Sequence, residues 1–341
     1  MSDIFIIFPR YIAHEVYVLD SRSTVAGGQN HTINIWHALS DSRSWLTFII
    51  CASLIAGLFG FALYLKSTPF FKSLGSRIDK ASLFAPDLIR IAFGASLLFS
   101  ASHASLYGPE LPLHSFVGGR IIQALLWVCG TALIIGLWSR LWATLAGLIW
   151  AWALLTKGVY MLTYVNYLGE AAAIYLLPLQ RMSLDYIVTN KNKAIRITKH
   201  ARYSMPITRI LFGLSLLYTA ISVKFMDTAL SLDVVNHYHL AHYFPFPPLF
   251  IVLGAGLIEV TVALLYMAGL LQRFTTIIFL VFMTLSLLFF KESVWPHYLL
   301  IAIAIGIFLH KPDNLAADKY LFSENKPPPV TRASPKAAVS K

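Results

Sequence analysis

Long apolar stretches separated by short polar segments make up most of the chain. Each stretch is about 17–21 residues long with few charges, and about 20 apolar residues cross a bilayer core as a helix. The pattern therefore predicts an all-α polytopic membrane protein with nine membrane-spanning helices. The expected spans are residues 45–65, 88–107, 121–138, 141–156, 159–178, 207–224, 249–270, 274–290 and 295–310. A β-barrel is disfavoured because its strands are alternating segments of about ten residues.

The composition agrees with a membrane protein. Of the 341 residues, 57% are hydrophobic and 13% are charged, whereas a soluble domain has about 25% charged residues. The formal net charge of +11 would also suit a protein that binds nucleic acid. The basic residues, however, lie in short segments between the apolar stretches. We therefore expect the lipid bilayer, and no nucleic acid, as the partner of this chain.

The basic residues also predict the orientation of the chain in the membrane. Lys and Arg follow the odd-numbered spans, whereas the loops 108–118 and 225–248 contain neither. The positive-inside rule places basic loops in the cytoplasm, so the N-terminus is expected outside and the C-terminus inside. The remaining parts are an outer segment at 1–44, a first span at 45–65, a basic cytoplasmic connector at 179–205 and a disordered cytoplasmic tail at 311–341.

An internal repeat divides most of the chain into two similar four-helix units. Leu88–Leu98 matches Ile207–Leu217, and Gly136–Arg140 matches Gly269–Arg273. An even number of spans separates the units, so both begin on the same side of the membrane and are parallel repeats. The two units are expected at residues 88–178 and 206–310.

The repeated unit resembles the DoxX-like family of membrane proteins. The resemblance is carried by Leu-Ile-Arg-Ile-x-Phe-Gly at residues 88–94, by Gly-Leu-x-x-Arg after the second helix of each unit, and by Glu259. The first unit departs from the pattern, because Leu126 stands where Glu259 would align. The resemblance implies a small bacterial inner-membrane protein and, for some members, a link to quinone-coupled redox reactions such as thiosulfate oxidation. It constrains the fold more than the chemistry.

Two carboxyl groups within the predicted spans are the main candidates for catalysis. Glu170 and Glu259 lie near the middle of the fifth and seventh spans, and Asn166 precedes Glu170 by one helical turn. Ionisable groups at this depth are costly and usually face the bundle interior or a wet cavity. One interpretation is a proton relay or a hydrogen-bonding site for a quinone head group. The other is a neutral glutamate that ties helices together through hydrogen bonds.

Two arginines occupy matching positions in the repeat. Arg90 and Arg209 are expected at the cytoplasmic ends of their helices, where a long basic side chain reaches the lipid headgroups. We interpret them mainly as interfacial anchors. Arg90, Arg209 and Asn166 are also the residues expected to bind a cofactor, for which quinone is the first choice.

Histidines gather in the loop before the seventh span. His237, His239 and His242 are close in sequence, and His297 is expected on the same outer side. Imidazoles at this spacing can share a copper or zinc ion, although no cysteine supports such a site. The alternative is an interfacial segment, since amphipathic rings suit the headgroup level. Haem is disfavoured because nothing in the sequence sets two histidines opposite each other.

Three functions are compatible with the sequence. The first is a DoxX-like subunit of a quinone-linked redox or respiratory assembly, with Glu259 and Glu170 near the quinone or proton site. The second is a transporter for a small solute or metal that uses the same glutamates and the outer histidines. The third is a non-catalytic assembly subunit that binds partner subunits through residues 1–65. No nucleotide-binding or hydrolase motif is visible, and whether the protein is an enzyme stays open.

Overall fold

The computed structural model describes residues 42–177, 181–188, 200–226, 228–290 and 295–321. Most of the outer segment, much of the connector and residues 322–341 of the tail lie outside the described residues. The part of the tail that the structure describes was expected to be disordered, but it contains the helix Ala317–Leu321 and the buried Asp313 and Asp318. The described residues form helices, and no strand occurs among them. The prediction of an all-α architecture is confirmed for this part of the chain.

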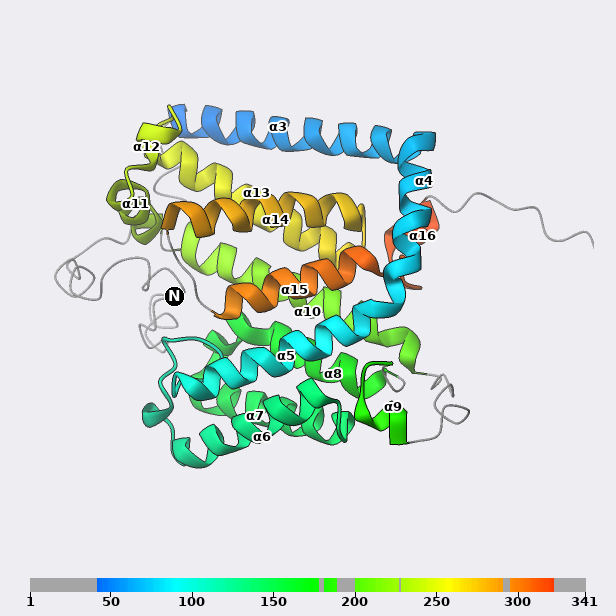
Figure 1. Cartoon of the computed structure of the whole chain (residues 1–341). Helices are drawn as coiled ribbons and strands as arrows, with labels where there is room; N and C mark the ends of the chain where they lie inside the picture. The colour runs from blue at the N-terminus through cyan, green and yellow to red at the C-terminus, as the bar shows by residue number, and fades with distance from the viewer. Residues whose placement is uncertain (1–41, 178–180, 189–199, 227, 291–294, 322–341) are drawn as a thin grey trace, which may run out of the picture.

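The long helices lie side by side in one bundle (Figure 1). They are α3 (Ser42–Ser67), α5 (Ala85–Ser102), α6 (Gly119–Ile135), α7 (Ser139–Lys157), α8 (Val165–Leu176), α10 (Ser204–Thr219), α13 (Pro248–Ala268), α14 (Gln272–Phe290) and α15 (Trp295–Leu309). Shorter helices join them, namely α4 (Pro69–Ile78), α9 (Leu184–Val188), α11 (Thr228–His237), α12 (Leu240–Tyr243) and α16 (Ala317–Leu321). The 3₁₀ segments η3 (Asp79–Phe84), η4 (Leu113–Ser115), η5 (Gly158–Tyr164) and η6 (Ala201–Tyr203) and the π-helix η7 (Ala220–Phe225) complete the described part.

The short helices cover the two ends of the bundle (Figure 1). α4, α9 and α16 lie at one end, which we call the basic end because the basic residues after α3, α6 and α13 lie there. α11 and α12 lie at the opposite end, which we call the α11 end. The segment 225–248, expected as a loop, thus contains two short helices.

Two groups of helices pack against each other. α5, α6, α7 and α8 form one group, and α10, α13, α14 and α15 form the other. The groups meet where α8 packs along α10 and where α5 packs along α15. A continuous apolar core runs through both. Its fully buried members include Leu97, Leu126, Phe212, Tyr266 and Ile303.

Six helical runs of the described residues are long and apolar enough to cross a membrane. They are Trp45–Ser67, Pro69–Ser102, Ser139–Leu176, Ala201–Phe225, Pro248–Ala268 and Gln272–Phe289. Large apolar side chains point outward along them, and Leu54, Leu155 and Leu288 are 65%, 86% and 68% exposed. So much exposed apolar surface is unfavourable in water and suits a lipid environment. The chain is therefore a multi-pass membrane protein embedded in a lipid bilayer.

The first helix stands at the edge of the bundle. α3 packs against α13, and only 11% of the residues in its most apolar 18-residue stretch are buried. Its remaining faces are open to lipid. Whether partner subunits bind through residues 1–65 stays a prediction.

The matching arginines Arg90 and Arg209 are fully buried, so the prediction that they reach lipid headgroups is wrong. Their exposed fractions are 0% and 1%. Arg90 donates hydrogen bonds to the last backbone carbonyls of α6 and to Asp87, and Arg209 binds the last carbonyls of α13 and Asp313. The last carbonyls of a helix have no partner within it, and a guanidinium has five donors. Each arginine therefore joins two helices at the basic end.

α6 and α13 end in the same kind of turn. Gly136 and Gly269 follow these helices with φ of +76° and +68°, a left-handed conformation that glycine adopts without strain. An aspartate then stabilises each turn. Asp185 accepts hydrogen bonds from two backbone N–H groups of the first turn, and Asp318 does the same in the second.

Candidate functional site

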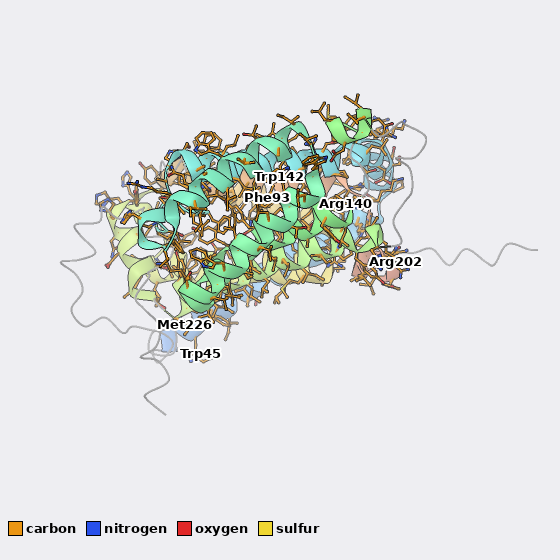
Figure 2. The ribbon with its side chains drawn as sticks, turned by 90° about the horizontal axis from the view of Figure 1, so that it is seen from below. Trp45, Phe93, Arg140, Trp142, Arg202 and Met226 are labelled. Carbon is orange, nitrogen blue, oxygen red and sulfur yellow. The ribbon has the colours of Figure 1, made fainter. Side chains whose placement is uncertain are left out.

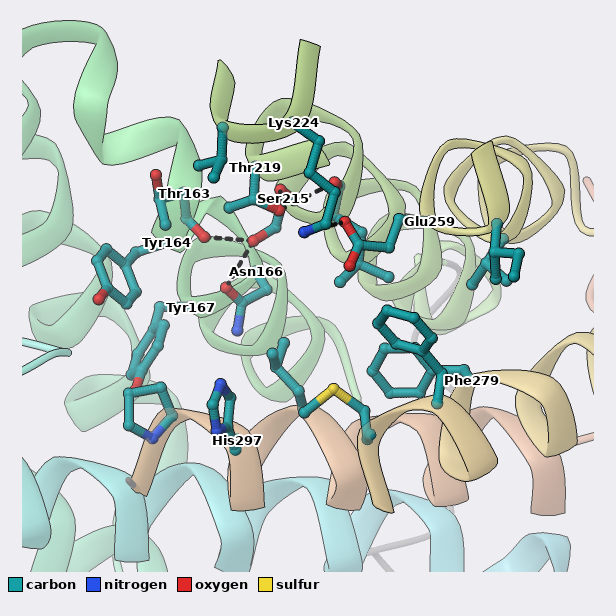
Figure 3. A pocket seen from close by; sticks show the side chains of 18 residues that line it. Thr163, Tyr164, Asn166, Tyr167, Ser215, Thr219, Lys224, Glu259, Phe279 and His297 are labelled. Carbon is teal, nitrogen blue, oxygen red and sulfur yellow. Dashed lines mark hydrogen bonds and ion pairs between the residues drawn. The ribbon is translucent and has the colours of Figure 1, made fainter. Parts of the chain in front are cut away.

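A small cavity lies between α8, α10, α13, α14 and α15 (Figure 3). Its volume is about 100 Å³. Much of the lining is apolar, from side chains such as Phe279 and Met283, and the polar side chains come from several helices. The latter include Thr163, Asn166, Ser215, Thr219, Lys224, Glu259 and His297. The cavity therefore collects polar groups in the interior of an apolar bundle.

The cavity lies in the half of the bundle near the α11 end. His297 is in the first turn of α15, Thr163 precedes α8, and Lys224 lies in the π-helix after α10. These three helix ends all face the α11 end (Figure 1). The hydrogen bond of 3.0 Å from the Trp295 indole to the Ser100 hydroxyl sets the start of α15 against α5.

An ion pair between Lys224 and Glu259 forms one wall of the cavity (Figure 3). The Lys224 Nζ lies 3.0 Å from the Glu259 Oε2, and the two side chains are 17% and 19% exposed. The cavity thus opens to the bundle surface at this wall. Glu259 is the twelfth residue of α13, which has 21 residues. The pair therefore lies near the middle of a helix that is long and apolar enough to cross a membrane.

A π-helix places Lys224 at this wall. Residues Ala220–Phe225 continue α10 with wider turns. Such π-helical turns are rare in proteins, and those that occur are often at functional sites. α13 approaches this segment closely at Gly256, where a Cβ would lie 3.0 Å from the Phe225 ring and 3.3 Å from the Lys224 Cβ. The absence of a side chain at Gly256 therefore lets Lys224 reach Glu259.

Asn166 and Ser215 form the opposite wall (Figure 3). The Ser215 hydroxyl donates a hydrogen bond to the backbone carbonyl of Thr163 and lies 3.2 Å from the side-chain oxygen of Asn166. The Asn166 amide nitrogen points toward the His297 ring in Figure 3. His297 is 1% exposed. Three predicted site residues on three different helices, Asn166, Glu259 and His297, thus line one cavity.

The other predicted histidines lie elsewhere. His237 and His239 line a surface depression at the α11 end, together with Tyr243 and Phe289. The His242 ring stacks edge-on against Tyr243 at 5.6 Å. No group of three potential metal ligands occurs in the described part of the chain. The structure therefore does not bring His237, His239 and His242 together with His297.

Glu170 is also separate from the cavity lining. It lies one turn beyond Asn166 on α8 and is 0% exposed. Its carboxyl oxygens have no hydrogen-bond partner among the described residues. An uncharged carboxylic acid is the form that such burial tolerates. Arg90 and Arg209 are at the basic end and do not line the cavity.

A third carboxyl group lies on the far side of the cavity wall. Glu110 is in the loop between α5 and α6, and its Oε1 accepts hydrogen bonds from Tyr160, at 2.9 Å, and from Tyr164. Tyr164 also lines the cavity. Burial raises the pKa of the Glu110 carboxyl, and the hydrogen bonds from Tyr164 and Tyr160 only partly offset this effect.

Sequence reasoning missed Lys224, Ser215 and Glu110. Lys224 had a signal, because it is an ionisable residue at the end of a predicted span. Glu110 also had one, since it is the only acid in the segment 103–118. Ser215 had none, because serine is common in membrane helices.

Known proteins give no match to this chain: no family model, no curated protein and no solved structure matches it. The resemblance to the DoxX-like family therefore stays a prediction.

Proposed function

We propose that the cavity at Lys224 and Glu259 is a proton-transfer site within a multi-pass membrane protein. The observation that carries this proposal is the ion pair itself, in the wall of a cavity at membrane depth. Ionisable side chains at this depth are costly, and they mark proton relays and ion pathways. Water has an average volume of about 30 Å³. A cavity of about 100 Å³ therefore has room for a short chain of water molecules.

Lys224 and Glu259 can take up one proton and release another in three steps. A proton from cavity water binds the Glu259 carboxylate, which leaves the Lys224 ammonium without its counter-ion. Lys224 then releases one proton to a second water molecule of the cavity. The proton on Glu259 moves across the 3.0 Å contact to Lys224, and the ion pair is restored. Glu170, one turn from Asn166, is the next carboxyl group toward the basic end.

Proton flux into liposomes tests this function. The purified protein is reconstituted with a pH-sensitive dye inside, and a potassium diffusion potential drives proton entry. We expect the Glu259→Gln and Lys224→Met variants to lose the flux by at least about tenfold, since each removes a proton-exchanging group. The matched control is Lys157→Met, which removes a lysine at the α11 end outside the cavity. Unchanged flux in Glu259→Gln would contradict the proposal.

Quinone-linked redox function is a second proposal. It is supported by the resemblance to the DoxX-like family and by the opening of the cavity beside the ion pair. The cavity is smaller than the roughly 150 Å³ that holds benzene in an apolar core, so a quinone ring does not fit inside it. A head group would have to bind at the open wall. Lipid extraction of protein purified in mild detergent should then yield about one quinone per chain, and its absence counts against this proposal.

The proposed architecture has nine spans in two parallel repeats. α6 and α15 are apolar but short, and α7 and α8 lie side by side as the arms of a hairpin within one apolar run. Counting α6 and α15 as spans, and α7 and α8 as two spans instead of one run, raises the number from six to nine. Two similarities between the units support the repeat. Arg90 and Arg209 each donate to backbone carbonyls near the end of the second helix of their unit, and Gly136 and Gly269 form turns of the same conformation.

The proposed location is a bacterial inner membrane with the basic end in the cytoplasm. The orientation is supported by the concentration of Lys and Arg at that end. The bacterial origin follows from the family resemblance alone.

A further inference from the structure

The loop between α5 and α6 is built into the bundle. Backbone hydrogen bonds join Leu106 to Leu111, at 2.7 Å, and Leu113 to Ala104, at 2.8 Å. Leu106, Tyr107 and Leu111 are fully buried. Tyr107 has a φ of +61°, a costly conformation for a bulky residue that persists only where the surroundings require it. The loop therefore holds its middle residues in a fixed position at the α11 end.

This loop presents Glu110 to two tyrosines. The Tyr160 and Tyr164 hydroxyls both donate to the Glu110 Oε1. A Cβ at Gly108 would collide with the Tyr164 hydroxyl and the Glu110 carboxyl. The loop and the tyrosines therefore form a close-fitting contact.

Tyr164 has two roles in this arrangement. Its side chain lines the cavity (Figure 3), and its hydroxyl is bound by Glu110 on the other side. Glu110 is partly exposed at the α11 end. The Tyr164 side chain thus lies between the cavity and Glu110. The opening of the cavity at Lys224 and Glu259 faces the apolar depth of the membrane. A hydrated ion is unstable there.

We propose that Glu110 latches Tyr164 as a gate between the α11 end and the cavity. The gate admits water or small polar solutes when the contact opens. This inference rests on the proposed function of the cavity, because it supplies the aqueous entrance that a proton-transfer site needs. Tyr160 shares the carboxylate and strengthens the latch.

A reporter cysteine in the cavity tests the gate. The chain has two cysteines, Cys51 and Cys129, both buried, and both are first replaced by alanine. Val262 lines the cavity and is 4% exposed, so Val262→Cys serves as the reporter. A cationic methanethiosulfonate reagent is applied in detergent micelles, where both ends of the bundle meet water. The labelling rate then measures how often the cavity opens to water.

The latch predicts a specific pattern of rates. Glu110→Ala and Tyr164→Phe should each label about tenfold faster than the parent, because each breaks the same hydrogen bond. The double variant should label no faster than the faster single variant, since the two residues act as one unit. Glu110→Gln keeps an acceptor of the same shape and should label close to the parent rate. Tyr243→Phe, at an exposed tyrosine of the same end, should leave the rate unchanged.

Two results would overturn the latch. One is a parent rate of labelling in both Glu110→Ala and Tyr164→Phe. The other is additive acceleration in the double variant, which would mean that the two changes loosen the protein separately. Melting temperatures identify a variant that fails to fold, and Tyr164→Phe then carries the test because it removes a single oxygen. The labelling needs no proton flux, so loss of flux in Glu259→Gln and failure of the latch are separate outcomes.

Discussion

Several charged side chains inside the described part of this protein are each held by a specific partner. The carbonyls at the ends of α6 and α13 hold Arg90 and Arg209, and Lys224 holds Glu259. Two tyrosines hold Glu110. The cost of burying a charge explains the pattern, because a buried ion is stable only when it is paired or hydrogen-bonded. The strength of each pairing can be measured by removing one partner.

Removal of Lys224 should destabilise the protein more than removal of the whole pair. A fully buried charge that loses its partner costs about 3–5 kcal/mol, and the partial exposure of this pair reduces the loss to about 1–3 kcal/mol. Lys224→Met should therefore lower the Tm in detergent, and Lys224→Met with Glu259→Gln should restore most of it. An equal Tm for the single and double variants would show that the pair contributes little.

The stability of the protein should depend on pH through Glu110. Burial raises the pKa of this carboxyl in the folded state, so the folded protein binds the proton more tightly than the unfolded chain does. The resulting stability is fully present below the ordinary pKa of a glutamate and is lost as pH rises through the raised pKa. Glu110→Gln should flatten this part of a plot of Tm against pH. The exposed Asp233→Asn serves as the control, and an unchanged curve for Glu110→Gln would contradict the prediction.

At the scale of helices, the apolar stretches predicted the last three spans well, whereas residues 103–107 of the expected span 88–107 belong to the loop after α5. The expected spans 249–270, 274–290 and 295–310 correspond to Pro248–Ala268, Gln272–Phe290 and Trp295–Leu309. Local backbone geometry was not predictable from hydrophobicity. The π-helix at Ala220–Phe225 and the 3₁₀ segment at Gly158–Tyr164 have the same apolar composition as ordinary helix. They depend on contacts with other helices, which periodicity does not contain.

The turn after α6 should tolerate substitution poorly. Gly136 has a φ of +76°, and a Cβ there would lie 2.9 Å from the Arg90 Nη1 and collide with Ser183. The left-handed conformation alone costs about 1–2 kcal/mol for a residue with a Cβ. Gly136→Ala should therefore lower the Tm clearly.

The matched control for this turn is Gly57→Ala in the middle of α3. Nothing lies within 4 Å of a Cβ at Gly57, and alanine is favoured over glycine in a helix by about 0.5–1 kcal/mol. Gly57→Ala should keep or raise the Tm. Equal effects of the two substitutions would mean that the conformation of Gly136 is not constrained.

At the scale of the whole molecule, packing decided which polar residues meet. Asn166, Ser215, Glu259 and His297 are distant in sequence and line one cavity because α8, α10, α13 and α15 pack around it. The histidines at 237, 239 and 242 are close in sequence, yet they lie apart from His297. Closeness along the chain therefore predicted the site less well than membership of facing helices.

Cysteine labelling tests the proposed orientation of the whole bundle. Ser115 is exposed in the loop between α5 and α6, and Ser76 is exposed in α4 at the basic end. In a background without Cys51 and Cys129, an impermeant thiol reagent should label Ser115→Cys in intact cells. Ser76→Cys should react only after the cells are permeabilised. The reverse pattern would place the basic end outside.

Figure 2 shows the bundle from below, with some side chains meeting between neighbouring helices and others pointing outward. The sequence alone determined the membrane class, the helices and their approximate bounds, because the length and apolar character of each stretch are local properties. Only the tertiary structure decided that Arg90 and Arg209 are buried and that Lys224 pairs with Glu259. It also decided that Glu110 accepts hydrogen bonds from two tyrosines beside the cavity. These contacts join residues from different helices, and their partners depend on how the helices pack.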